Sequence, residues 1–174
     1  GDYFICASER QRDFWLGALA AAGRLDLAHI SADPDLRTLI DVVAFGLPQA
    51  LPAKSGPGPR GMFPAIGRDD VVLLWNGGMW NWLDPLTAIR ATALLVEHIP
   101  NVRLVFMGTR SPGAQVAEMD VVGTSRRLAA DLGLLDTHVF FNEWVAYDER
   151  QNWLLEADVA LSLHVATVEA RFAF

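Results

Sequence analysis

Short apolar runs and amphipathic stretches alternate along the second half of the chain. The apolar runs "VVLLW", "VRLVFMG", "HVFFN" and "DVALSL" begin at residues 71, 102, 138 and 158. Runs without polar alternation are typical of strands buried on both faces of a parallel sheet. The stretches between them, at about residues 84–98, 114–132 and 147–157, have the spacing of helices. This alternation predicts an α/β fold with a Rossmann-like parallel sheet and flanking helices.

The first part of the chain predicts a smaller strand and helix unit. Residues 3–7 predict a strand, and Ser8 follows it as the N-cap of a helix that ends at Gly23. We expect a second short helix over "DPDLRTLI", residues 33–40, because Asp33 precedes a proline at the first helical position. The run "IDVVAF" then predicts another strand.

The composition changes between Gly46 and Asp70. This stretch, "GLPQALPAKSGPGPRGMFPAIGRDD", is rich in proline and glycine, which predicts a linker or a long surface loop. We therefore divide the chain into residues 1–45, a linker over residues 46–70, and the main domain over residues 71–174.

Composition excludes several classes of partner. The chain has 174 residues, of which 52% are hydrophobic, and a formal net charge of −7. Sequence-independent binding of nucleic acid depends on clustered Lys and Arg, so this charge argues against a nucleic-acid partner. The single cysteine, Cys6, excludes an internal disulfide and a Cys-based zinc site. No apolar stretch approaches the roughly 20 residues that span a bilayer, and the start of the chain lacks the basic region of a signal peptide. We expect a cytoplasmic location, with peripheral membrane attachment of the parent protein as the alternative.

A glycine pair, Gly77–Gly78, follows the first strand of the main domain. Ligands of open α/β sheets bind at the carboxyl ends of the strands, which is where this pair lies. Its backbone N–H groups could approach an anion, with the helix that begins near Asp84 behind them. The alternative is a tight turn that needs positive φ. The pair matches neither the G-x-G-x-x-G fingerprint nor a P-loop, so its spacing alone favours the simple turn.

Three further side chains at this edge each have two interpretations. Arg110 is either a phosphate partner or a solvated loop residue, and Trp144 either stacks on a base or fills the core. His164 is a candidate general base, but a single His after an apolar strand is more often a structural hydrogen-bonding group. The charged residues of "DERQNWLLEAD" predict a solvated helix face with no role in a site.

Several segments, taken in order, resemble one family. "DYFICASERQRDFWLG", "IDVVAFGLP", "VVLLWNGG", "VRLVFMGTR" and "HVFFNEWVAYDERQNWLLEADVALSLH" are similar to successive segments of the GT-B glycosyltransferases of the retaining group 1, or family 4, class. "VEARFAF" falls where that family has the first Glu of its E-x7-E motif, which is Glu169 here. The resemblance rests on the order of segments over nearly the whole chain. It implies that residues 1–45 end an N-terminal GT-B domain and that residues 71–174 are an incomplete nucleotide-sugar-binding domain.

The resemblance also implies a set of site residues. They are Glu169 as the catalytic residue and Gly77, Gly78, Arg110, Trp144, Val145, Arg171 and Phe172 for donor and nucleotide binding. The glycines would approach the phosphates, Trp144 and Val145 would bound the base, and the backbone at residues 171–172 would meet the diphosphate. The family usually places an Arg and a Lys just after the glycine turn, where this chain has "MWNWLD". Either Arg110 or Arg171 takes their place, or donor binding differs.

The expected activity is transfer of a sugar from a nucleotide-sugar with retention of configuration, without a cofactor or a bound metal. A GT-B-fold nucleotide-sugar epimerase and a non-catalytic nucleotide-binding or interaction module are the alternatives. The sequence does not name the base, the sugar, or the glycan, lipid or small-molecule acceptor. Because the chain starts without Met and ends before a second Glu of the motif, we expect an inactive fragment. Such a fragment would pair with a missing N-terminal domain or self-associate.

Overall fold

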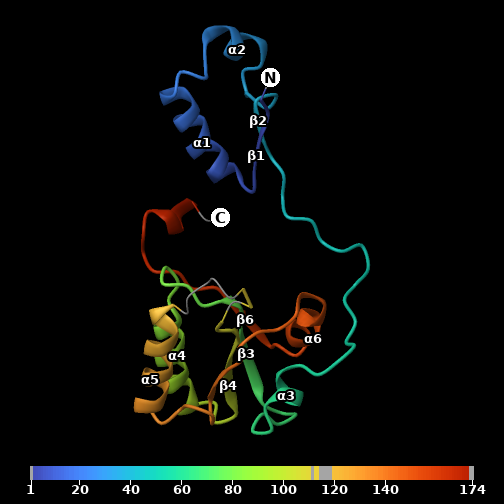
Figure 1. Ribbon diagram of the computed structural model, residues 1–174, viewed down its shortest axis with the longest axis vertical. Coiled ribbons are helices and arrows are strands. Elements are labelled where there is room, and N and C mark those ends of the chain that lie inside the picture. The colour runs from blue at the N-terminus through green and yellow to red at the C-terminus, as the bar shows by residue number, and fades with distance from the viewer. Residues whose placement is uncertain (1, 111, 114–118, 173–174) are drawn as a thin grey trace. The chain divides into compact units, whose positions relative to one another are not determined.

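The computed structural model describes residues 2–110, 112–113 and 119–172, without the side chain of Glu169. The chain divides into two compact units. The smaller is formed by Gly1–Gln49 with Ala166–Phe174, and the larger by Ala50–Val165. Figure 1 shows the helices and strands of each unit along the chain.

The larger unit is built on a four-stranded sheet in which every pair of neighbouring strands is parallel. The strand order is β5-β4-β3-β6. The strands are β3 (Val71–Gly78), β4 (Val102–Gly108), β5 (Val139–Phe141) and β6 (Val159–Leu161). The chain therefore moves outward from β3 to β5 and then returns to the other side of β3, as in doubly wound sheets. The predicted Rossmann-like α/β fold is confirmed.

Both faces of this sheet are covered. Helices α4 (Pro85–Val96) and α5 (Asp120–Asp131) pack on one face, where Phe106 belongs to their apolar core. The short helix α6 (Arg150–Leu154) lies on the other face, where Val105 is buried against Trp153. Figure 1 shows α4 and α5 on one side of the strands and α6 on the other. Burial on both sides explains why the strands show no polar alternation in the sequence.

Local signals set the ends of these helices. Asp84 is the N-cap of α4, and its carboxylate accepts a hydrogen bond from the Thr87 N–H at 3.0 Å. Gly133 follows α5 with φ of 69°, as a helix-ending glycine does. The expected start of that helix, near residue 114, lies outside the described residues, and the described helix begins at Asp120.

The Pro/Gly-rich stretch after residue 49 packs against the larger unit and contains the short helix α3 (Pro59–Met62). The side chain of Asn152, which is buried, accepts hydrogen bonds from the backbone N–H groups of Ser55 at 2.7 Å and Gly56 at 3.1 Å. Arg60 donates its backbone N–H to the Glu156 carboxylate at 2.9 Å and its guanidinium to the Glu156 carbonyl at 2.7 Å. These bonds fasten the stretch to the chain around α6.

The smaller unit pairs β1 (Phe4–Cys6) with β2 (Ile40–Val42) in parallel. Between them lie α1 (Glu9–Ala21) and α2 (Leu27–Ala32), and η2 (Glu169–Phe172) belongs to the same unit. The Ser8 side chain caps α1 by accepting the Gln11 N–H at 3.3 Å, and Gly23 follows the helix with φ of 66°. The predicted ends of this helix are confirmed.

The predicted helix over residues 33–40 is wrong. A helix forms just before this stretch, as α2, and residues 33–39 are turns and irregular chain. The carboxylate of Asp33 accepts the N–H of Thr38 at 2.7 Å and its hydroxyl at 2.8 Å, so it closes a loop and does not cap a helix. The buried Arg12 holds the same loop by donating to the Ile40 carbonyl at 2.9 Å.

Gly58 has no room for a side chain. A Cβ there would lie 2.5 Å from the Asn152 carbonyl oxygen and 2.6 Å from Cδ of Glu156. We expect Gly58→Ala to lower the free energy of unfolding by about 1–3 kcal/mol, as forced overpacking does. Gly67→Ala is the control, because its nearest atom, Oδ2 of Asp70, is 3.6 Å away. Urea denaturation measures both, and equal stabilities would contradict the packing around α6.

We expect the free energy of unfolding to fall in acid because of the Glu156 carboxylate. Burial raises its pKa, but hydrogen bonds from the Lys54 ammonium and the Arg60 N–H outweigh burial and hold the pKa below its ordinary value of 4.5. Such a group stabilises the fold above its unfolded pKa, and the contribution is lost as pH falls through the folded pKa.

We therefore expect Glu156→Gln to be less stable than the wild-type chain by about 1 kcal/mol at neutral pH. The difference should shrink as the pH falls below the ordinary pKa of a glutamate, because the unfolded wild-type chain then binds a proton that the folded carboxylate does not yet bind. It vanishes once the folded carboxylate is protonated as well. Urea denaturation at neutral pH and at about pH 3.5 measures this difference. If the difference in unfolding free energy between the two chains is the same at both pH values, the carboxylate charge does not stabilise the fold.

Candidate functional site

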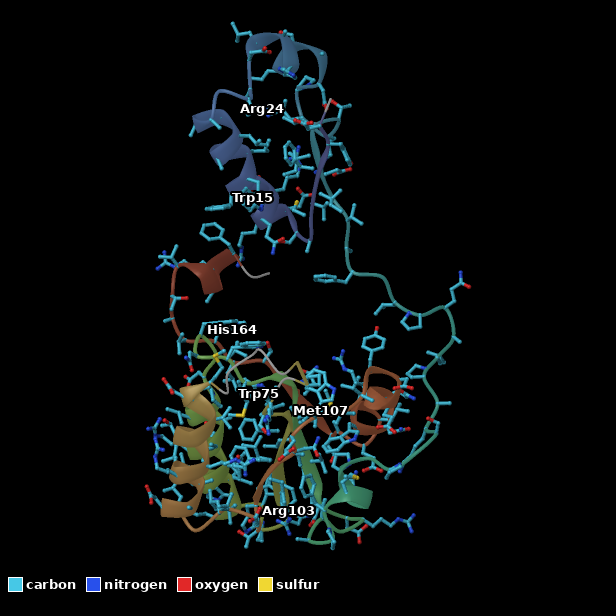
Figure 2. The ribbon with its side chains drawn as sticks, viewed as in Figure 1. Trp15, Arg24, Trp75, Arg103, Met107 and His164 are labelled. Carbon is cyan, nitrogen blue, oxygen red and sulfur yellow. The ribbon has the colours of Figure 1, made fainter. Side chains whose placement is uncertain are left out.

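A pocket of about 210 Å³ lies at the carboxyl ends of β3 and β4. The ends of these strands form one wall, and the segment that leads from β5 to α6 forms the other. Its lining residues are Asn76, Gly77, Gly78, Met107, Gly108, Trp144, Val145, Tyr147 and Arg150. We call this hollow the rim pocket; one of its lining residues, Met107, is labelled in Figure 2. It brings together four of the predicted donor-binding residues, which are Gly77, Gly78, Trp144 and Val145.

The strand wall of the rim pocket contains a β-bulge. Trp75 pairs with Phe106 and Gly78 with Gly108, so β3 has one more residue than β4 between these two pairs. The Trp75 indole N–H donates to the Gly78 carbonyl at 3.2 Å and holds the bulge in place. A bulge leaves the extra residue out of the ladder and bends the strand, and bulges are common beside binding sites.

The two glycines of this wall have different reasons for lacking a side chain. Neither has positive φ, which among the described glycines is found at Gly23 and Gly133, so the interpretation as a positive-φ turn is wrong. A Cβ at Gly78 would lie 3.0 Å from the Trp80 indole nitrogen, so packing restricts that position. A Cβ at Gly77 would meet no described heavy atom within 4 Å. Neither backbone conformation nor packing therefore requires a glycine at position 77.

The opposite wall is held by Asn142, which directly follows β5. Its side-chain amide donates to the carbonyls of Met107 and Trp144, both at 2.9 Å. The Thr109 hydroxyl donates to the Asn142 carbonyl at 2.9 Å. These bonds fasten the segment after β5 to the end of β4. The Trp144 ring consequently lies over Gly108, with ring atoms 3.6 and 3.8 Å from where a Cβ would be, and it is 51% exposed.

Arg150 supplies the positive charge of the rim pocket and was not among the predicted site residues. Its guanidinium carbon lies 5.5 Å from the centre of the Tyr147 ring, and Tyr147 lines the same pocket. The predicted solvated face did not place Arg150 at a pocket, but Asp148 and Glu149 are exposed as expected. That the charges of this segment have no role in a site stays a prediction. The signal was present in the sequence, since an aromatic and an Arg three residues apart lie on the same side of a helical turn.

Arg110 and His164 are not among the described lining residues of the rim pocket. Arg110 is exposed, and its backbone N–H donates to the Glu143 carbonyl at 3.0 Å. The backbone of His164 forms a bridge with Leu83, and its Nε2 lies 3.3 Å from the Ser162 hydroxyl. The structural interpretation of His164 fits these contacts better than that of a general base.

The remaining predicted residues lie in η2, in the smaller unit. The side chain of Glu169 lies outside the described part of the chain. The carbonyl of Arg171 accepts a hydrogen bond from the Arg10 guanidinium at 3.1 Å, and the Phe172 ring lies 4.9 Å from that of Phe14. Both contacts join η2 to α1. That Glu169, Arg171 and Phe172 take part in donor binding stays a prediction.

The N-terminus of α4 does not offer a free positive end. The Asp84 carboxylate accepts the Thr87 N–H at 3.0 Å and the Thr87 hydroxyl at 2.7 Å. Pro85, the first helical residue, has no N–H to donate. The negative charge of Asp84 already occupies the position where an incoming anion would be stabilised by the helix dipole.

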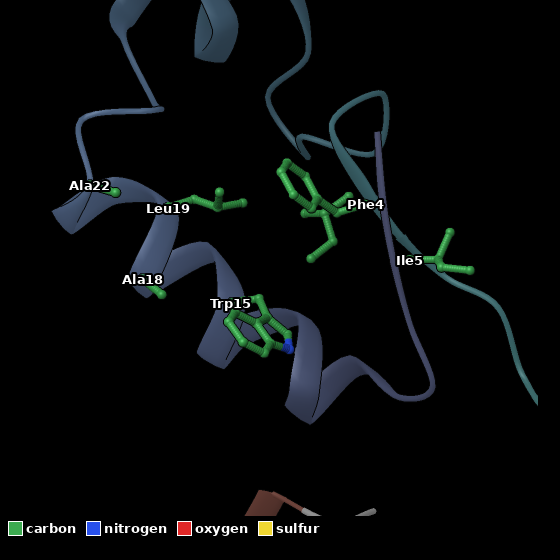
Figure 3. A pocket seen from close by; sticks show the side chains of 7 residues that line it. Phe4, Ile5, Trp15, Ala18, Leu19 and Ala22 are labelled. Carbon is green, nitrogen blue, oxygen red and sulfur yellow. The ribbon is translucent and has the colours of Figure 1, made fainter. Parts of the chain in front are cut away.

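A larger hollow lies in the smaller unit, between α1 and the strand pair. It has a volume of about 510 Å³, and Figure 3 shows Trp15, Leu19 and Phe4 around it. Its described lining carries no ionisable side chain; the residues are Phe4, Ile5, Trp15, Ala18, Leu19, Ala22 and Ile40. Because polar substrates need placed polar groups, the rim pocket is the better candidate for a functional site.

Neither a metal centre nor a membrane-spanning helix is found in the described parts of the chain. Their His, Cys, Asp and Glu residues form no group of three or more that could hold a metal ion. None of the described helices has both the length and the apolar character needed to cross a membrane. A scan against models of known protein families and a search of curated proteins both give no match.

We expect Gly77 and Gly78 to respond differently to substitution by alanine. Gly77→Ala should leave the free energy of unfolding unchanged or raise it by up to about 1 kcal/mol, since the methyl group has space and the unfolded chain loses freedom. Gly78→Ala should lower it by about 1 kcal/mol, because Trp80 has to move. Urea denaturation of the two variants compares them, and a larger loss for Gly77→Ala would overturn this view of the bulge.

Proposed function

We propose that the rim pocket binds the nucleotide part of a nucleotide-sugar, and that the chain is the donor-binding part of a retaining glycosyltransferase. The single observation that carries this proposal is Gly77. It lines the pocket at the carboxyl end of β3, yet neither backbone strain nor packing within the described structure requires a glycine there. A glycine at such a position lets the backbone approach a ligand closely, as at phosphate-binding turns.

The side chains around Gly77 fit the parts of a nucleotide. Trp144 offers a half-exposed ring held in place over Gly108, which suits stacking on a base. Val145 is buried beside it and adds an apolar wall. The backbone of Gly77 and Gly78 belongs to the strand wall of the pocket, across from Trp144 and Val145. An aromatic platform facing a glycine bulge supports a ligand with a flat ring and a compact polar group.

The size of the rim pocket argues for partial enclosure of the ligand. Its volume of about 210 Å³ is below the roughly 300–1,000 Å³ of sites that enclose a drug-sized molecule. A base with part of its ribose phosphate fits such a volume, and the sugar of a nucleotide-sugar would extend beyond it. This agrees with a donor site in which the reacting sugar lies outside the base pocket.

Sugar transfer is proposed on two grounds. The order of segments along the chain resembles the GT-B glycosyltransferases, and the larger unit has the Rossmann-like sheet that the resemblance implies. In such a reaction the protein has to stabilise the diphosphate that leaves, which needs donors and positive charge aimed at it. Glu169, Arg110, Arg171 and Phe172 are the further residues that the proposal assigns to donor binding, with Glu169 at the transferred sugar.

Calorimetric titration of the chain with UDP-, GDP- and dTDP-sugars tests the proposal. We expect one of these nucleotides to bind, and Trp144→Leu to weaken its binding about tenfold or more, because base stacking contributes roughly 1–3 kcal/mol. Trp82→Leu is the matched control, since Trp82 is 54% exposed and Trp144 is 51% exposed. Trp82 is not among the described lining residues. Gly77→Ala should also weaken binding while it preserves the fold.

The possible outcomes separate the alternatives. Binding that Trp144→Leu weakens and Trp82→Leu does not places the nucleotide in the rim pocket. Interconversion of two nucleotide-sugars without an acceptor would indicate the epimerase, and binding of none of the nucleotides would indicate an interaction module. Equal effects of the two Trp variants would reject the rim pocket as the base site.

A further inference from the structure

We propose that Arg150 binds the anionic group of the ligand in the rim pocket, which for a nucleotide-sugar is its diphosphate. This inference rests on the proposed function for the identity of the ligand. Arg150 lines the rim pocket together with Gly77 and Gly78 of the β3 bulge, so a group bound in this pocket has both along its walls. The guanidinium would supply positive charge, and at the glycine bulge the backbone could approach the anionic group closely.

The guanidinium of Arg150 is available for such a ligand. It is half-buried, and the described side chains give it no carboxylate partner among their ion pairs. Its contact is with the ring of Tyr147, 5.5 Å from the guanidinium carbon. A guanidinium held over an aromatic ring keeps its N–H donors, which lie in its own plane, free for a phosphate. The adjacent Asp148 and Glu149 are exposed and are not among the described lining residues.

Among the described lining residues of the rim pocket, Arg150 is the one that carries a positive charge. The N-terminus of α4 carries its own carboxylate, Asp84. Arg110 is exposed and is not among the described lining residues. The whole chain has a net charge of −7, so a general positive field does not attract an anion. A phosphate in the rim pocket therefore depends on Arg150, which can bond two of its oxygens at once.

The test compares each nucleoside with its diphosphate. The wild-type chain and its variants are titrated with uridine and UDP, guanosine and GDP, thymidine and dTDP, and with inorganic pyrophosphate. We expect Arg150→Gln to weaken binding of the nucleoside diphosphate and of pyrophosphate about ten- to a hundredfold, as loss of a charged hydrogen-bond donor does. Binding of the nucleoside should change little, because the base lies against Trp144. Arg150→Lys should retain only part of the affinity, because a lysine keeps the charge but cannot form bidentate hydrogen bonds.

Arg90→Gln is the control for net charge. Arg90 is exposed on α4, the helix that covers the opposite face of the sheet from α6, and its loss should leave all affinities unchanged. Added salt should weaken diphosphate binding to the wild-type chain more than to Arg150→Gln, because salt screens the charge pair. Circular dichroism and urea denaturation confirm that each variant folds.

The failure of this inference is distinguishable from failure of the proposed function. If nucleosides bind but Arg150→Gln lowers nucleoside and diphosphate affinity equally, or lowers neither, the inference is wrong and the nucleotide site stands. If only pyrophosphate binds and Arg150→Gln weakens it, Arg150 is an anion-binding residue in a site that does not take nucleotides. If the wild-type chain binds none of these probes, both proposals are wrong.

Discussion

The parallel pairing of β3 with β4 is the interaction on which the larger unit depends. These two strands are the central pair of the sheet, and their side chains alternate between two apolar cores, with Phe106 in one and Val105 in the other. A parallel pair cannot be closed by a tight hairpin, so the chain has to travel over a face of the sheet between one strand and the next. The helices that cover the two faces are a consequence of this constraint.

The same constraint creates the rim pocket. The chain leaves β5 at one edge of the sheet and has to reach the face opposite α4 and α5 before it returns as β6. On this path it passes the carboxyl ends of β4 and β3, where Asn142 and Thr109 fasten it. This connection places the Trp144 ring over Gly108. It also brings Arg150 to the pocket that Gly77 lines. The rim pocket is thus formed where a crossing connection meets a bulged strand end, and the carboxyl edge of an open α/β sheet is where such folds commonly bind ligands.

Two sequence-based errors have a common physical cause. Asp33 was expected to cap a helix, but its carboxylate bonds Thr38 in a loop that the buried Arg12 also holds. The short motif allowed both arrangements, and a partner from α1 decided between them. The glycine pair was expected to need positive φ if it was a simple turn, but it belongs to a bulge whose geometry depends on pairing with β4. In both cases the local residues allowed two structures, and a contact with another part of the fold distinguishes them.

The sequence by itself determined the alternation of strands and helices, and with it the fold class. Strands buried on both faces lose polar alternation, and caps such as Asp84 or a closing glycine such as Gly133 act within a few residues, so these signals are local. It also placed Gly77, Gly78 and Trp144 at one edge of the sheet, because the carboxyl ends of parallel strands meet there. Only the tertiary structure decided that Gly77 lacks a structural reason to be glycine and that Arg150 shares its pocket. Gly77 and Arg150 are more than 60 positions apart in the sequence, and no local pattern relates residues over that distance. The fold alone brings them to one pocket.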